Sequence, residues 1–239
     1  MSMSKKLLII IPCYNEEHAL PLVLEKLLQL RLPEGYNMKI AVVNDCSQDN
    51  TKTIAELYPV IMLDLLVNLG IGGAVQTGFL YAKENGFDIA IQLDGDGQHP
   101  PEELIKLLTS HEKTGNNVVI GSRFLDEGGF KSSFARRIGI RYFHLLNKLF
   151  TGKNIYDSTS GFRLLDSAAI DLASEKYPDE YPEPASLVLF SKAGLSIQEV
   201  PVIMSGRLAG KSSIRNFVSL YYCIKVTISM LFLFIRKPY

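Results

Sequence analysis

Apolar runs of five to seven residues alternate with amphipathic stretches through the first half of the chain. The runs predict buried strands at residues 7–11, 39–43, 60–66, 89–93 and 117–121. The stretches between them predict helices at residues 15–30, 70–84 and 100–115, the first with Asn15 as its N-cap. Strands that alternate with helices favour a mainly parallel sheet covered on both faces. The pattern therefore predicts an α/β fold.

The pattern changes after Arg123, where two apolar and positively charged helices are expected. Residues 132–150 form a basic amphipathic pattern, which suits either the protein's own core or a membrane surface. Residues 217–235 are almost all apolar and approach the ~20 residues of a spanning helix. Because Lys225 lies near their middle, spanning is costly. We therefore expect a helix at the bilayer interface, with a helix buried in the protein as the alternative.

The composition indicates a domain with no global charge to attract nucleic acid. The chain has 239 residues, is 47% hydrophobic and carries a formal net charge of zero. Its three cysteines are scattered, which argues against a zinc site or a disulfide framework and favours a reducing compartment. The apolar run after Lys5 and Lys6 is too short for a signal peptide. We therefore expect the protein to work in the cytosol, without nucleic acid as a partner.

Two carboxylates end the strand expected at residues 89–93. Asp94 and Asp96 are two residues apart, so in extended backbone their side chains leave the same face. Such a pair repels unless a cation lies between the two groups, and carboxylate oxygens suit Mg²⁺ or Mn²⁺ with a phosphate substrate. The alternative is an acidic turn in which an Asp caps the next helix.

Other polar side chains follow the first two expected strands. Tyr14 can stack on a base, Glu16 can accept a hydrogen bond from a ribose, and Asp45 can accept one from an imide N–H. Each could instead be a turn or cap residue. Because the carboxyl ends of strands one, two and four converge on one crevice of an open α/β sheet, a shared ligand site is the stronger interpretation.

The motifs, taken in order, resemble family 2 glycosyltransferases of the GT-A fold. They are Pro12-Cys13-Tyr14-Asn15-Glu16, Val43-Asn44-Asp45-Cys46-Ser47, Asn68-Leu69-Gly70, Asp94-Gly95-Asp96-Gly97-Gln98-His99-Pro100 and Gly121-Ser122-Arg123. Two later segments, 157–163 and 207–213, narrow the resemblance to the branch of dolichyl-phosphate mannose synthases and polyprenyl-phosphate glycosyltransferases. The resemblance implies a Rossmann-like, mixed and mainly parallel sheet flanked by helices. The patterns of residues 132–150 and 217–235 add the expectation of amphipathic helices at a membrane interface.

The resemblance also implies a reaction, the inverting transfer of a sugar from a UDP- or GDP-sugar to a polyprenyl phosphate. By position, the nucleoside would be held by Pro12, Tyr14, Glu16 and Asp45. Asp94 would lie near the ribose and the metal, and Asp94, Asp96 and Gln98 would ligate Mg²⁺ or Mn²⁺. Donor and acceptor phosphates would be addressed by Arg123, Arg163, Arg207, Lys211 and the adjacent Ser212.

Two further acids are candidates for handling the acceptor. Asp157 would orient or deprotonate it, or else cap a turn, and Glu183 occupies the region where many family 2 enzymes hold a base. Three departures from the family pattern stand out: Asn44 replaces an acid, Ile71 replaces a basic residue, and Ala185 replaces a second acid. A phosphate monoester has a second pKa near ~6, so it needs little help from a base.

The expected enzyme has a catalytic domain at residues 1–213 and a membrane-associating segment at residues 214–239. We expect it at the cytoplasmic face of a membrane as a peripheral or monotopic protein, with a small integral membrane protein as a further possible partner. Two alternatives stay open. One is a glycosyltransferase acting on a saccharide hydroxyl, and the other is a non-catalytic scaffold that binds nucleotide sugars.

Overall fold

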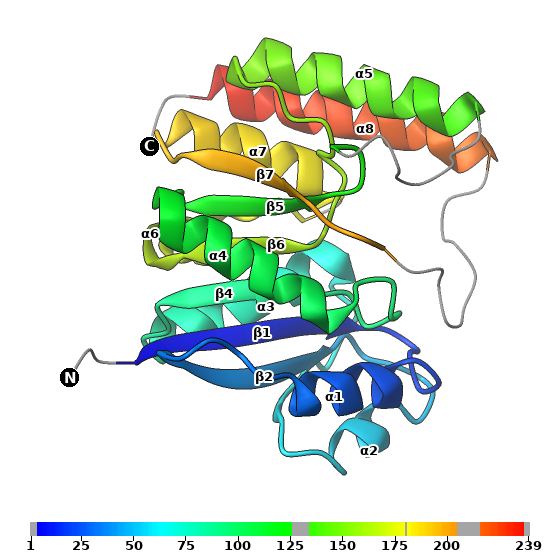
Figure 1. Ribbon diagram of the computed structural model, residues 1–239. Coiled ribbons are helices and arrows are strands. Elements are labelled where there is room, and N and C mark those ends of the chain that lie inside the picture. The colour runs from blue at the N-terminus through cyan, green and yellow to red at the C-terminus, as the bar shows by residue number, and fades with distance from the viewer. Residues whose placement is uncertain (1–3, 126–133, 180, 205–215, 237–239) are drawn as a thin grey trace.

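The computed structural model describes residues 4–125, 134–179, 181–204 and 216–236 (Figure 1). The strands are β1 (Lys5–Cys13), β2 (Tyr36–Asn44), β3 (Ile61–Asp64), β4 (Ile89–Gln92), β5 (Val118–Ser122), β6 (Arg163–Asp166) and β7 (Ile197–Pro201). The helices are α1 (Leu20–Gln29), α2 (Thr51–Ala55), α3 (Gly70–Glu84), η1 (Pro101–Glu103), α4 (Leu104–Thr114), α5 (Phe134–Thr151), α6 (Ser167–Lys176), α7 (Pro182–Lys192) and α8 (Asn216–Ile235).

The strands form one mixed sheet in the order β3-β2-β1-β4-β6-β5-β7. Within the described residues, β6 alone runs against its neighbours, antiparallel to both β4 and β5, while the other pairings are parallel. The predicted α/β class and mainly parallel sheet are therefore confirmed. The antiparallel insertion of β6 brings the segment before Arg163 next to the end of β4, since Gln92 pairs with Arg163.

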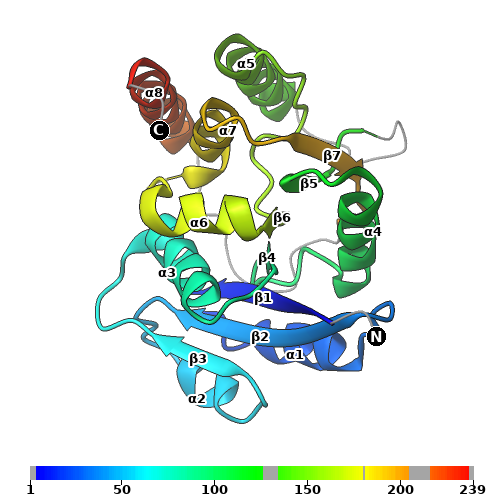
Figure 2. The same ribbon diagram turned by 90° about the vertical axis from the view of Figure 1, so that its left-hand side faces the viewer.

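Helices cover both faces of the sheet (Figure 2). On one face, α1 and α4 bury Leu24 and Leu107 against Ile9 and Ile91. On the other, α3, α6 and α7 close over a second cluster that includes Phe79. The central strands are apolar on both faces, which explains why their sequences are continuous apolar runs rather than alternating ones.

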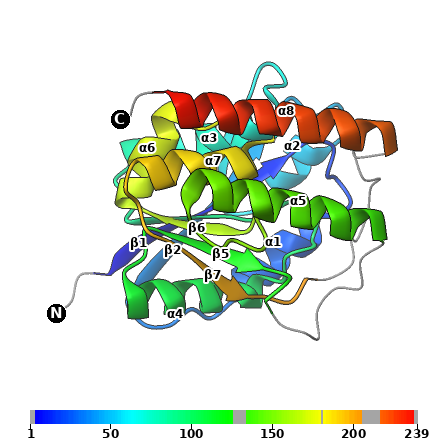
Figure 3. The same cartoon turned by 90° about the horizontal axis from the view of Figure 1, so that it is seen from above.

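Helices α5 and α8 lie side by side and pack on α7, away from the sheet (Figures 1 and 3). Phe143 of α5, Val188 of α7, and Val226 and Met230 of α8 form their shared core. Both helices were predicted within one or two residues of their ends. No helix in the described part of the chain is long and apolar enough to cross a membrane.

The structure corrects several expected boundaries. Helix α1 begins at Leu20, and Asn15 is not its N-cap, because Asn15 has left-handed backbone (φ 57°) and the cap position belongs to Ala19. The third strand spans only Ile61–Asp64. The helix expected from residue 100 opens with the 3-10 turn η1 and ends, as predicted, at Gly115 with φ 66°.

Candidate active site

The ends of β1, β2 and β4 meet at one edge of the sheet. Cys13 lies opposite Asn44, the amide N–H of Asp45 donates to the carbonyl of Cys13, and that of Leu93 donates to Ile10. Gly95 approaches the first strand so closely that a β-carbon there would lie 2.9 Å from Cys13 Sγ. The motifs that follow these three strands therefore lie close together at one edge of the sheet.

Loops 14–17 and 47–51 are tied together beside this edge. Asn15 donates its amide N–H to Ser47 Oγ and accepts from the amide of Gln48 through Oδ1, and Glu16 donates its amide N–H to Thr51 Oγ1. These bonds hold Asn15 in its left-handed conformation. Pro12 is buried within β1, and Tyr14 projects from the loop with 46% of its surface exposed. The Tyr14 ring is thus available to stack on a base.

Asp45 is used by the protein in a way that the sequence did not predict. Its two carboxylate oxygens accept the amide N–H groups of Leu69 and Gly70 at 2.7 and 2.9 Å, and its carbonyl accepts from the Asn68 side chain. The residue is buried. Asp45 therefore caps the start of α3 and sets the loop ahead of it.

In the acidic turn after β4, the backbone and the side chain of Gln98 both donate hydrogen bonds to Asp96. The Gln98 amide N–H donates to Asp96 Oδ1 at 3.0 Å, and Gln98 Nε2 donates to Asp96 Oδ2 at 2.5 Å. Gly97 has φ 76°, which lets the chain turn back between them. Asp96 is only 6% exposed, whereas the side chain of Asp94 is 36% exposed. Asp94 is thus the more open of the two carboxylates.

His99 hydrogen-bonds to the backbone of Asp94, a role that the sequence did not reveal. Its ring stacks on Phe162 with centroids 5.0 Å apart, and Nδ1 accepts the amide N–H of Asp94 at 3.4 Å. Burial lowers the pKa of His99, although Asp94 and Asp96 oppose that effect. A neutral imidazole is the form that can accept at Nδ1.

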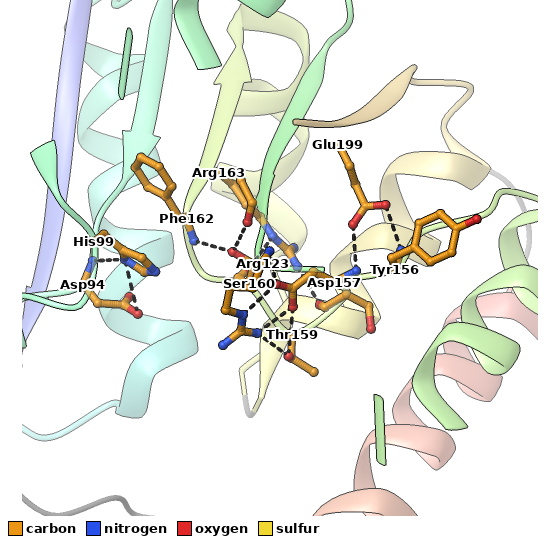
Figure 4. Close-up of polar contacts among 12 residues, drawn as sticks. Asp94, His99, Arg123, Tyr156, Asp157, Thr159, Ser160, Phe162, Arg163 and Glu199 are labelled. Atoms are coloured by element: carbon orange, nitrogen blue, oxygen red, sulfur yellow. Dashed lines mark hydrogen bonds and ion pairs between the residues drawn. The ribbon is translucent and has the colours of Figure 1, made fainter. Parts of the chain in front are cut away.

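Arg123 and Asp157 form a bidentate ion pair next to the acidic turn (Figure 4). Arg123 Nε donates to Asp157 Oδ2 at 2.6 Å and Nη2 donates to Oδ1 at 2.5 Å, while the amide N–H of Arg123 also reaches Oδ2. Burial lowers the pKa of Arg123, but the bonds and charge of Asp157, together with the charges of Asp94 and Glu183, raise it overall. The sequence predicted both residues for the site but not that they pair.

Glu199 of β7 holds the backbone on which Asp157 sits. Its two carboxylate oxygens accept the amide N–H groups of Tyr156 and Asp157 at 2.8 and 2.7 Å. Burial raises the pKa of Glu199, and those same two bonds oppose the rise. In Figure 4, Phe162 and Asp157 lie between Asp94 on one side and Glu199 on the other. No motif marked Glu199 in the sequence.

Arg163 does not have the phosphate-binding geometry that the sequence led us to expect. It is 1% exposed, and its guanidinium donates to the carbonyls of Ser158 and Ser160 and to Ser186 Oγ. Each of its three guanidinium nitrogens thus donates to the protein, and the bonds tie β6 to α7 and the loop 158–160. We therefore reassign Arg163 as a positioning residue.

Glu183 lies at the N-terminal turn of α7. Burial raises its pKa, while the positive charges of Arg163 and Arg123 act in the opposite direction and that of Asp94 adds to the rise. The pKa of Glu183 is therefore influenced by the charges of Arg163, Arg123 and Asp94. The remaining predicted residues, Arg207, Lys211 and Ser212, lie outside the described residues.

Three comparisons place this architecture among known proteins. The pattern of glycosyl transferase family 2 matches residues 8–172. The UDP-N-acetylglucosamine–dolichyl-phosphate N-acetylglucosaminyltransferase of Methanococcus voltae is 32% identical, over 83% of this chain and 85% of its own. The undecaprenyl-phosphate mannosyltransferase of Micrococcus luteus is 32% identical, over 87% and 86%. Glucosyl-3-phosphoglycerate synthase from Mycobacterium tuberculosis, solved with Mn²⁺ and UDP, has a TM-score of 0.71 at 18% identity, over 96% and 80%.

The sheet order, the helix layers and the structural likeness together define the GT-A fold. The family match covers more than half of the chain. The chain therefore belongs to glycosyl transferase family 2 and is a glycosyltransferase.

Proposed function

We propose that this enzyme transfers a monosaccharide from a UDP- or GDP-sugar to a polyprenyl phosphate, with inversion and with Mg²⁺ or Mn²⁺. The observation that carries the proposal is the acidic turn of Asp94, Asp96 and Gln98 beside the buried Arg123–Asp157 pair. A site that meets a donor diphosphate and an acceptor phosphate needs both a cation and fixed positive donors. Relatives 32% identical over most of their length are named for polyprenyl-phosphate acceptors.

The donor set of the turn fits a hard divalent cation. Two carboxylates and a carboxamide oxygen are the ligand types that Mg²⁺ and Mn²⁺ take, and Mg²⁺ uses one or two carboxylates and fills its other positions with water and substrate phosphates. Within the described ranges, no cluster of three or more His, Cys, Asp or Glu side chains could hold a metal by itself. Asp94, Asp96 and Gln98 would hold the cation, which when bound neutralises charge on the leaving diphosphate.

The nucleoside side of the site would be formed by Pro12, Tyr14 and Glu16. Asp45 would hold the neighbouring loop 68–70 in place. Tyr14 has an exposed ring for the base, and the loops around it are already fixed by hydrogen bonds. Asp45 would support this side of the site, because its two carboxylate oxygens accept the backbone N–H groups of Leu69 and Gly70.

The acceptor side would be formed by Arg123 and Asp157, with the predicted Arg207, Lys211 and Ser212 adding contacts to phosphate. Only 11% of the Arg123 side chain is exposed, and that of Asp157 is fully buried. Asp157 holds Nε and Nη2 of the Arg123 guanidinium, and Nη1 would address an incoming phosphate oxygen. Asp157 would thus orient the acceptor through Arg123, and the phosphate, already anionic, would attack without a strong base.

The outer faces of α5 and α8 would rest on a membrane surface. Exposed apolar side chains recur every three or four residues along both helices, and we call these rows the outer apolar stripes. They consist of Tyr142, Leu145 and Leu149 on α5 and of Tyr221, Ile224, Ile228, Leu231 and Ile235 on α8. Exposed Arg141 and Lys148 lie among them on α5. Apolar stripes with basic neighbours are typical of helices that lie in an anionic interface. Segment 214–239 would therefore be the membrane-associating part, next to a catalytic domain at residues 1–213.

The transfer reaction can be tested with a panel of donors and acceptors. The purified protein is incubated with radiolabelled UDP- and GDP-sugars, Mn²⁺ or Mg²⁺, and either undecaprenyl phosphate, dolichyl phosphate or a saccharide. We expect an organic-soluble labelled lipid with at least one donor. Label found only in a saccharide product would contradict the acceptor assignment and support transfer to a hydroxyl, for which Glu183 is the base.

The membrane contact can be tested by co-sedimentation with vesicles of phosphatidylglycerol and phosphatidylethanolamine. Leu145→Glu or Ile228→Glu places a charge in an outer apolar stripe and should weaken binding about tenfold, the equivalent of about 1.4 kcal/mol. Leu57→Glu is the matched control, because Leu57 is 78% exposed but lies beyond α2, away from both helices. Equal loss in all three variants would refute a docking role for α5 and α8.

A further inference from the structure

The side chain of Gln92 is buried next to the acidic turn without a hydrogen-bond partner. It is 0% exposed, and neither Nε2 nor Oε1 has a partner among the described residues. Among those residues it is the one side chain with two such atoms. Buried polar groups are almost always paired, and an unpaired amide lowers the stability of the folded state. Gln92 therefore calls for an explanation beyond packing.

The position of Gln92 relates it to Asp94. The two residues are two apart at the end of β4, so their side chains leave the same face of the sheet. Gly161 faces both side chains from the segment that leads into β6. It comes two residues before Arg163, which pairs with Gln92 in the sheet. A β-carbon at Gly161 would meet Gln92 Nε2 at 2.9 Å and Asp94 Oδ1 and Oδ2 at 3.0 and 3.3 Å. The amide and the carboxylate thus face a common space that glycine leaves open.

None of the other described groups around this space is hydrogen-bonded to the amide. Arg163 gives its Nε, Nη1 and Nη2 donors to three other oxygens. His99 uses Nδ1 to accept from the backbone of Asp94. The carboxylate of Asp94 is a charged acceptor that faces the same space as the Gln92 amide.

We propose that Gln92 is a positioning residue whose amide donates to the Asp94 carboxylate when a divalent cation and a nucleoside diphosphate occupy the site. The hydrogen bond would hold one oxygen of Asp94 and leave the other for the cation. Outer contacts of this kind orient metal-binding carboxylates and change metal affinity by about 10–100-fold. The inference rests on the proposed function, and it explains why the folded chain retains an unpaired amide at this place.

The test compares metal binding with stability in three variants. Mn²⁺ binding is measured by electron paramagnetic resonance with UDP or GDP present, and Tm is measured without metal. Gln92→Met removes the unpaired amide at similar volume, so we expect Tm to rise by about 2–6 °C while Mn²⁺ binds about tenfold more weakly. Gly161→Ala fills the shared space and should weaken Mn²⁺ binding without raising Tm. Ser110→Ala removes another unpaired buried oxygen, on α4, and should leave Mn²⁺ binding unchanged.

The outcomes separate this inference from the proposed function. If wild-type protein binds Mn²⁺ with nucleotide and Gln92→Met binds it equally well, Gln92 has no positioning role and the inference is overturned, whatever the transfer activity. If Gln92→Met lowers Tm, the amide is already paired in the metal-free protein and the inference is overturned, whatever the change in Mn²⁺ binding. Unchanged Mn²⁺ binding by Gly161→Ala also overturns it. A wild-type protein that binds no Mn²⁺ with either nucleotide overturns both the metal assignment and the inference.

Discussion

Asp157→Asn removes the negative partner of the buried pair in the candidate site while keeping an oxygen for the amide N–H of Arg123. The guanidinium of Arg123 then loses its bidentate carboxylate and keeps the hydroxyl of Thr159 as a partner. Only 11% of its side chain is exposed, so water cannot replace the lost partner. The substitution should therefore destabilise the fold as well as reduce transfer.

The size of the effect follows from the burial of the two side chains. Removing one partner of a buried ion pair costs about 3–5 kcal/mol. The asparagine oxygen still accepts from the Arg123 backbone, so we expect the lower limit, about 3 kcal/mol. A domain of this size loses about 2–4 °C of Tm per kcal/mol, which predicts a fall of about 6–12 °C.

The assay is a double-mutant cycle in which the free energy of unfolding of each variant is measured by urea denaturation, monitored by circular dichroism. Arg123→Met alone should cost a similar amount, because Asp157 is then the unpaired buried charge. The double variant should cost at least about 1.5 kcal/mol less than the sum of the single variants, since neither charge is left behind, and it should not recover transfer activity. Additive costs within about 0.5 kcal/mol would refute the pairing as the source of stability.

Three further outcomes are expected. Asp96→Asn should weaken Mn²⁺-dependent binding of UDP or GDP by more than about tenfold in isothermal titration calorimetry, and unchanged binding would remove Asp96 from the metal site. Burial raises the pKa of Glu183 above its usual 4.5, so the folded state holds this proton longer than the unfolded state, and stability should fall as pH rises through the interval between the two pKa values. Glu183→Gln should lack that fall when urea unfolding is compared across this interval, and equal pH slopes would contradict the burial argument. Lys192→Met should speed hydrogen exchange at residues 233–236, because Lys192 Nζ binds the carbonyls of Leu233, Phe234 and Arg236, and identical exchange would show that this contact does not hold the end of α8.

Much of the fold could be predicted because buried parallel strands and amphipathic helices have strong local patterns. The central strands and the helices α3, α4, α5 and α8 are where the apolar periodicity placed them. The local sequence pattern predicted the structure least well where a polar side chain could serve either of two roles. Asn15 suited a helix cap, but its bonds to Ser47 and Gln48 hold it in a left-handed turn instead.

Strand β6 shows what could not be predicted. The strand has four residues and begins with Arg163, so its sequence suggested a phosphate-binding motif rather than a strand. Its place between β4 and β5 depends on pairing with residues about 45 to 75 positions earlier, which no local pattern encodes. That placement buries Arg163 and turns it from a ligand-binding candidate into a support for the loop 158–160.

The sequence by itself determined the class of fold and the chemical groups of the site, because apolar periodicity and the ends of parallel strands are local properties. It placed Asp94 and Asp96 at one sheet edge and selected Arg123 and Asp157. Tertiary structure alone decided which of these groups face one another, since a carboxylate can cap a helix, as Asp45 does, or pair with a guanidinium, as Asp157 does. Those choices are made by contacts between residues far apart in the chain.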